Sequence, residues 1–222
     1  MDDAPPAPPK ILALSTAGRK PSAAIVQGDA VLATWAADGS DGLAASLPVA
    51  IADLVAAHGA PDLIAVCAGP GSFTGLRTGM SVAAGLAAGY AIDVVAVTQA
   101  EAMAAELGEL TAGRALWTAV DSRRDRVFLD QGAGFASVAI ADVQAPRAAI
   151  AVAGDATIAL AASLAARGAN VMLTGARDAQ PRFVARAALL RVAGVLPPLA
   201  CEPLYVDQPA VSVPAAAAAA LG

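Results

Sequence analysis

A glycine-rich segment, GPGSFTGLR at residues 69–77, has the composition best suited to chemistry in this chain. Apolar residues 63–67 predict a strand before it, and the small residues 80–90 predict a helix after it. A strand, a glycine turn and a helix N-terminus direct backbone N–H groups at one point, where an anion can bind. The same layout also serves as a tight structural crossover, and both interpretations stay open. The residues that could form a phosphate or nucleotide loop are Gly69, Gly71, Ser72, Thr74, Gly75 and Arg77.

This segment departs from the better-known catalytic motifs. Leu76 follows Gly75 where a Walker A motif requires lysine, so the residue that reaches the terminal phosphates is missing. Gly71 stands where a GxSxG motif would have its serine. The chain has a single histidine, His58, and no Cys/His cluster. We therefore expect neither a hydrolase triad nor a metal site, and no cofactor.

Composition narrows the class of protein further. The chain has 222 residues, a formal net charge of -5, 57% hydrophobic and 15% charged residues. An acidic surface repels polyanions, so we expect no strong binding of nucleic acid by the chain alone. The longest uncharged stretch, residues 78–92, is shorter than the roughly 20 residues of a membrane helix. The acidic, proline-rich start does not resemble a signal peptide, so we expect a cytoplasmic protein without membrane contact.

The hydrophobic periodicity predicts an α/β protein of two lobes. The first half reads β-β-β-α-β-α-β-α, with strands at 11–14, 22–27, 31–35, 63–68 and 93–97 and helices at 43–57, 80–90 and after Thr98. Glu101 lies three residues beyond Thr98, as in a capping box. The second half is less regular, with strands at 115–120, 127–129, 150–153 and 171–173 and helices at 156–166 and 181–192. We expect a disordered arm at 1–9, an N-terminal lobe at 10–108, a smaller C-terminal lobe at 109–208 and a tail at 209–222.

Two helical faces are candidates for contact with a partner. The helix after the glycine loop carries small residues at helical spacing, which would let a second helix approach closely; these are Ser81, Ala84, Gly85, Ala88 and Gly89. The preceding helix has an apolar stripe that could supply the other half of such an interface, formed by Leu43, Leu47, Ile51 and Leu54. Either face could instead pack against the protein's own sheet.

A charged turn follows the first strand of the second half. It contains Arg123, Arg124 and Arg126. Such a turn is usually a solvated hairpin tip, and the sharper hypothesis is a small patch that contacts phosphates.

The glycine segment resembles the signature of the TsaB (YeaZ) family. Four further segments are similar to that family: ILALST at 11–16, Leu47-Pro48, DSRR at 121–124 with Val127-Phe128, and PLYV at 203–206. The resemblance implies an actin-like, Hsp70-like and sugar-kinase-like (ribonuclease-H-like) fold. It also implies a non-catalytic scaffold that binds TsaD, the subunit that transfers a threonylcarbamoyl group to the adenosine beside the tRNA anticodon. TsaE joins this pair, tRNA is reached through the complex, and the same helices can form a homodimer. With this resemblance, the phosphates that the arginine turn could contact are those of the tRNA in the assembled complex.

The chain departs from the family and its catalytic relatives in ways that argue against catalysis. Ser15 stands where the family usually has aspartate, and a hydroxyl holds a metal poorly. The second loop, Gly154-Asp155-Ala156, lacks a paired glycine, and the histidine pair of catalytic relatives is absent. The alternative hypothesis is an ATP-dependent small-molecule kinase of the same superfamily, for which Asp121 and Asp155 are the candidate acids.

Overall fold

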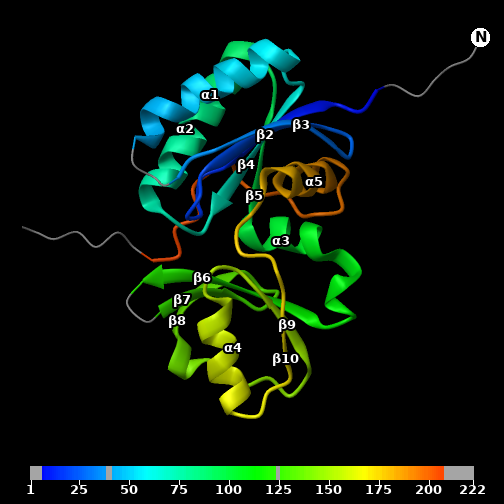
Figure 1. Cartoon of the computed structure of the whole chain (residues 1–222). Coiled ribbons are helices and arrows are strands. Elements are labelled where there is room, and N and C mark those ends of the chain that lie inside the picture. Colours follow the sequence, from blue (N-terminus) through cyan, green and yellow to red (C-terminus); the bar gives the residue numbers. More distant parts are fainter. Residues whose placement is uncertain (1–6, 39–41, 124–125, 208–222) are drawn as a thin grey trace, which may run out of the picture.

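The computed structural model describes residues 7–38, 42–123 and 126–207, and its first half forms a five-stranded mixed sheet with three helices (Figure 1). The strand order is β3-β2-β1-β4-β5; β1, β2 and β3 are antiparallel neighbours, and β1, β4 and β5 run parallel. The elements are β1 (Lys10–Ser15), β2 (Ser22–Gln27), β3 (Ala30–Ala36), α1 (Leu43–His58), β4 (Leu63–Gly69), α2 (Phe73–Tyr90), β5 (Val94–Thr98) and α3 (Gln99–Leu107).

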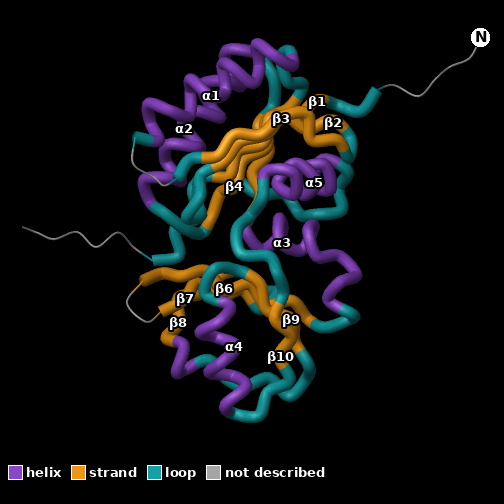
Figure 2. Tube along the Cα trace, in the orientation of Figure 1, coloured by secondary structure: helices purple, strands orange, loops and turns teal. Residues whose placement is uncertain are grey.

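The second half repeats this pattern. Its sheet has the order β8-β7-β6-β9-β10, with antiparallel β6, β7 and β8 and parallel β6, β9 and β10. The elements are η1 (Gly108–Thr111), β6 (Ala115–Arg123), β7 (Arg126–Asp130), β8 (Phe135–Ala139), η2 (Ile140–Asp142), β9 (Ile150–Ala153), α4 (Thr157–Ala166), β10 (Val171–Leu173) and α5 (Pro181–Val192). The short η2 stands where the first half has α1. Figure 2 shows the two sheets as separate orange layers.

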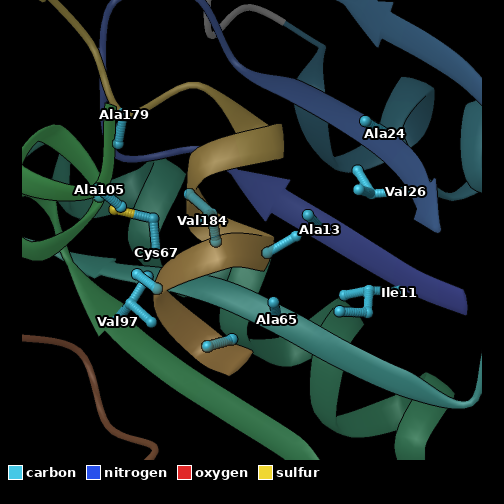
Figure 3. Packing of buried hydrophobic residues seen from close by; sticks show 14 of the residues in the cluster. Ile11, Ala13, Ala24, Val26, Ala65, Cys67, Val97, Ala105, Ala179 and Val184 are labelled. Carbon is cyan, nitrogen blue, oxygen red and sulfur yellow. The ribbon is translucent and has the colours of Figure 1, made fainter. Parts of the chain in front are cut away.

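The alternation of side chains along the first sheet divides its core into two layers. Ile11 and Ala13 of β1 lie in one cluster with Val184 of α5, and Figure 3 shows them facing that helix. Leu12 and Leu14 point to the opposite face, into a cluster with residues of α1 and α2. Because successive side chains of a strand alternate between faces, the uninterrupted apolar run in β1 supplies both layers.

Helix α5 returns to the first sheet. It packs on β1, β2, β4 and β5 and beside α3, although the sequence assigned its residues to the C-terminal lobe. The Arg191 side chain fixes this position by forming an ion pair with Glu101 of α3 and by donating to the backbone oxygens of Ala96 and Pro197. The predicted residue bounds of the two lobes, 10–108 and 109–208, stay predictions. Helix α5 lies within the second of these ranges but covers the first sheet.

The predicted α/β class is confirmed, and the strands form two sheets. The capping box of α3 is also confirmed, since Thr98 N–H donates to Glu101 and Glu101 N–H donates to the Thr98 hydroxyl. The sequence pattern did not indicate β8. The helix after the glycine loop begins seven residues earlier than predicted, because Ser72 caps α2 directly before Phe73. Within the described residues, no helix has the length and apolar character needed to span a membrane.

Candidate functional site: the glycine loops and the α1–α2 face

Ser72 organises the glycine loop between β4 and α2. Its hydroxyl accepts a hydrogen bond from the Gly75 N–H at 3.2 Å, as an N-cap does. Its own N–H donates to the backbone oxygen of Ala17 at 2.8 Å, so the loop is tied to the turn that follows β1. The N–H groups of Gly75 and Ser72 therefore both have acceptors within the protein.

The glycines of this loop make room for the same turn. A Cβ at Gly71 would lie 2.2 Å from the Ala17 oxygen, and one at Gly75 would lie 2.1 Å from the Thr16 oxygen. Neither distance is possible for a real side chain, so glycine is required for this close packing. The space next to the loop is filled by backbone oxygens, whose partial negative charge disfavours a phosphate. The geometry favours a structural crossover over a phosphate cradle.

The second glycine loop, between β9 and α4, is closed in the same manner. A Cβ at Gly154 would lie 2.0 Å from the Ala119 oxygen of β6. The Ala156 N–H donates to that same oxygen at 3.1 Å. The two halves of the molecule thus use similar contacts: the first loop packs on the turn directly after β1, and the second packs on the middle of β6.

Asp155 of the second loop is held by the end of β6. The Asp121 N–H donates to its carboxylate at 2.7 Å. Burial raises the pKa of Asp155, the charges of Asp178 and Asp121 raise it further, and the Asp121 amide and Arg19 oppose the rise. Among the residues that the structure describes, no group of three His, Cys, Asp or Glu side chains could hold a metal ion.

Arg77 points to the C-terminal segment. Its guanidinium lies 3.8 Å over the Phe73 ring, and its Nε donates to the Tyr205 hydroxyl at 3.0 Å. The sequence proposed Arg77 as part of a phosphate loop, together with Thr74, which is exposed. The contact with Tyr205 was not predicted, because the two residues lie 128 positions apart and no local pattern joins them.

The small-residue stripe of α2 faces solvent. Its five residues are exposed, and a Cβ at Gly85 or Gly89 would meet nothing within 4 Å; the stripe consists of Ser81, Ala84, Gly85, Ala88 and Gly89. These residues therefore do not pack on the protein's own sheet. Whether they contact a partner stays a prediction.

The apolar stripe of α1 is part of the core, which corrects our expectation for it. Each of its side chains is 8% exposed or less and lies in the cluster beneath α1 and α2; the four are Leu43, Leu47, Ile51 and Leu54. An amphipathic helix buries its most apolar face first, and here its own sheet covers that face. Leu43, Leu47 and Leu54 are therefore not available to a partner, and Ile51 contributes only the small surface that lines the groove described next.

An apolar groove lies between α1 and α2 and shares one residue, Ile51, with that stripe. The groove has a volume of about 140 Å³ and lies beside the small-residue stripe. We call it the α1–α2 groove; its lining residues are Pro48, Ile51, Ala52, Val55, Val82, Leu86 and Tyr90. The sequence pattern that could have indicated this groove is the helical spacing of Pro48, Ala52 and Val55. Each of these residues directly follows a residue of the apolar stripe of α1.

The arginine turn is described in part. Arg126 donates to the hydroxyl of Ser137 at 3.1 Å and to its backbone oxygen at 2.9 Å. Arg124 lies outside the described residues, and Arg123 pairs with Arg126 through the backbone at the end of the β6–β7 hairpin. The proposed contact with tRNA stays a prediction.

Comparison with known proteins places this chain in a family. The model of the family described as TsaD, tRNA N6-adenosine threonylcarbamoyltransferase, matches residues 41–173, which is more than half of the chain. The chain belongs to this family. A curated relative, the tRNA threonylcarbamoyladenosine biosynthesis protein TsaB of Haemophilus influenzae, is 39% identical over 70 residues. That match spans 32% of this chain and 30% of the relative.

Two solved structures of YeaZ type from Pseudomonas aeruginosa share the fold. One, a protein with similarity to the peptidase YeaZ, has a TM-score of 0.70 at 22% identity and covers 90% of this chain and 100% of its own. The other, YeaZ, has a TM-score of 0.69 at 23% identity, and the match covers 89% of this chain and 99% of that protein's chain. The family assignment made from the glycine segment is confirmed, and so is the predicted actin-like and ribonuclease-H-like fold.

Proposed function

We propose that this protein is a scaffold subunit in tRNA threonylcarbamoyladenosine biosynthesis, which binds TsaD and supports its transfer reaction. The names of the matching family model and of the Haemophilus influenzae relative support this pathway. In this proposal TsaE joins the assembled complex, tRNA is reached through that complex, and the protein acts in the cytoplasm.

The closed glycine loops support a non-catalytic role. The N–H groups of Ser72 and Ala156, which would face a phosphate in an active nucleotide site, donate to the backbone oxygens of Ala17 and Ala119. A ligand would have to break these hydrogen bonds and displace the turn after β1. Transfer chemistry in this proposal is performed by the partner.

The α1–α2 groove and the adjoining small-residue stripe support a docking face, and this is the observation that carries the proposal. The stripe lets a partner helix come close to the backbone of α2, and the groove offers apolar side chains to pack against. Tyr90 at the end of α2 is 41% exposed and is the aromatic residue of this face. Aromatic residues in such positions are common anchors of binding energy.

The test is co-expression of the full chain with a TsaD candidate, followed by sizing of the purified complex. We expect one stable species larger than either protein, and its loss with Ala84→Glu, which places a charge on the small-residue stripe. Unchanged co-elution of Ala84→Glu with TsaD would reject this face. Sizing of the isolated chain in the same experiment shows whether the face also forms a homodimer.

One observation favours the alternative of an ATP-dependent kinase. Asp155 is a half-buried acid whose pKa is raised by its burial, as is typical of a general base. Calorimetry with Mg-ATP separates the two proposals, because tight binding with turnover requires the glycine loops to open. We expect neither.

A further inference from the structure

The C-terminal segment 203–207, which we call the clasp, reaches from the first sheet to the second. Near its start, the Leu204 N–H donates to the backbone oxygen of Ala68 at 2.8 Å. At its end, the Asp207 carboxylate accepts a hydrogen bond from the Ser137 hydroxyl at 3.1 Å. Ala68 belongs to β4 of the first sheet and Ser137 to β8 of the second. A short piece of chain is therefore attached to both halves of the molecule.

Tyr205 attaches the middle of the clasp to α2. Its hydroxyl accepts a hydrogen bond from Arg77 Nε at 3.0 Å. Its ring lies beside that of Phe73, with the centroids 5.3 Å apart and an interplanar angle of 35°. The Arg77 guanidinium lies over both rings, 3.8 Å from the centroid of Phe73 and 5.9 Å from that of Tyr205. These contacts fix the tyrosine ring on the first turn of α2.

Arg126 of β7 supports the far end of the clasp. Its Nε donates to the Ser137 hydroxyl oxygen at 3.1 Å, and a second guanidinium nitrogen donates to the Ser137 backbone oxygen at 2.9 Å. The hydroxyl hydrogen of Ser137 is thereby directed to Asp207. Hydrogen bonds in such a chain polarise one another, so the cationic guanidinium strengthens the contact between the serine and the aspartate.

The clasp bridges a cavity and is not packed into a core. The cavity, which we call the aromatic pocket, has a volume of about 360 Å³ and lies between the clasp, the glycine loop and Phe128 of β7. None of the residues of the clasp is buried, and the rings of Phe73 and Tyr205 are 41% and 40% exposed. A segment with exposed hydrogen bonds and few buried contacts opens at a low cost in free energy. We therefore expect the clasp to open while both sheets stay folded.

A different kind of contact joins the two halves at α3. Met103 of α3 and Ala153 of β9 are fully buried and belong to one apolar cluster. Figure 1 shows the red clasp at the left, between the two sheets, and α3 at the right. Apolar packing at α3 resists separation more than exposed polar contacts do. A rotation of one half relative to the other would therefore open the clasp side and use α3 as its pivot.

We propose that residues 203–207 are a releasable clasp that holds the two halves of the molecule in one arrangement and, when it opens, lets them rotate about α3. Its attachments to Ala68, Arg77 and Ser137 act as one unit, because the clasp is too short to stay ordered at one end after release at the other. The proposal does not depend on the docking face, because none of these contacts involves the α1–α2 groove or the small-residue stripe.

Amide hydrogen exchange of the full chain, followed by NMR, tests whether the clasp opens as a unit. Asp207→Ala removes the attachment to β8 and should speed exchange of the Leu204 amide by about 2- to 10-fold, the change expected for the loss of one hydrogen bond. Tyr205→Phe keeps the ring, removes the acceptor for Arg77 and should act in the same range. Glu202→Ala removes an exposed acid next to the clasp and is the matched control, which should leave this exchange unchanged. Amides inside β1 should exchange alike in all variants.

Distances between spin labels on the two halves test what the clasp does. Ala45→Cys in α1 and Ala165→Cys in α4 provide exposed attachment points, and Cys201→Ser removes the exposed native thiol. We expect one narrow distance distribution with the intact clasp, a broader one with Asp207→Ala, and a narrow one with Glu202→Ala.

Three results would overturn the proposal. The first is a broad distance distribution with the intact clasp, which would show that the halves are not held. The second is an unchanged distribution with Asp207→Ala, which would show that the clasp does not hold them. The third is equal exchange of the Leu204 amide in Asp207→Ala and Glu202→Ala, which would show that the two ends of the clasp are independent.

Discussion

Alanine substitutions at Gly75 and Gly85, two glycines of the same helix, should change stability in opposite directions. At Gly75 a Cβ would lie 2.1 Å from the backbone oxygen of Thr16, and 0% of the Thr16 surface is exposed. At Gly85 a Cβ would meet nothing within 4 Å. The pair therefore separates the intrinsic helix preference for alanine from the close packing of the glycine loop on the turn after β1.

The magnitudes follow from two opposing contributions. Alanine is favoured over glycine in a helix interior by about 1 kcal/mol, which is the whole effect expected at Gly85. Gly75 lies in the first turn of α2, where this gain is at most as large, and it is opposed by overpacking against backbone, which costs about 3 kcal/mol. The net result is a loss of about 2 kcal/mol. For a protein of this size, 1 kcal/mol shifts the Tm by about 2–4 °C.

The assay is thermal unfolding followed by circular dichroism, with both variants and the unmodified chain in one buffer. Gly75→Ala should lower the Tm by about 4–8 °C, and Gly85→Ala should raise it by about 2–4 °C. If Gly75→Ala is as stable as the unmodified chain, the turn after β1 does not fill the loop. The loop would then have room for a ligand, and our argument against a phosphate site would fail.

Three further predictions concern the ion pair, the buried acid and the two thiols. Arg191→Ala should lower the free energy of unfolding, measured by chemical denaturation, by about 3 kcal/mol. The reason is that the Glu101 carboxylate loses its partner in a largely buried position. A loss below about 1 kcal/mol would contradict this prediction. The pKa of Asp155 is raised in the folded state, so its contribution to stability falls as pH rises above the ordinary value of about 3.9. Asp155→Asn keeps an acceptor for the Asp121 amide and should be more stable than the unmodified chain at pH 7, with the difference vanishing near pH 3; equal stability at both pH values would reject the assignment. Burial raises the pKa of Cys67 to about 12 whereas Cys201 is exposed, so a thiol reagent at pH 8 should modify one cysteine in the folded protein and two after denaturation.

Local patterns in the sequence were sufficient for most of the elements. The apolar run of residues 11–14 predicted β1, and the Thr98 and Glu101 pair predicted the start of α3, because both depend on neighbouring residues. Strand β8 was missed because its sequence, FASVA, has weak alternation and its residues are mostly half-buried.

Contacts between distant segments could not be predicted from those patterns. The sequence pattern predicted a helix at 181–192 and did not show that β1 and β4 would cover it. The stripe containing Leu47 was correctly apolar, but a helix pattern does not tell whether a partner or the protein's own sheet buries it. The aromatic pocket depends on Tyr205 meeting Phe73, which only the folded chain brings together.

The affinity of the purified chain for TsaD, measured for Gly85→Leu and for Ala162→Leu, tests the scaffold proposal most directly. Gly85 lies on the small-residue stripe and Ala162 is an exposed small residue of α4, so both variants place the same side chain on a helix surface. We predict that Gly85→Leu remains folded and weakens binding by about 5- to 150-fold through overpacking of the interface, whereas Ala162→Leu binds like the unmodified chain. Equal affinity of the two variants for TsaD would contradict the proposed docking face.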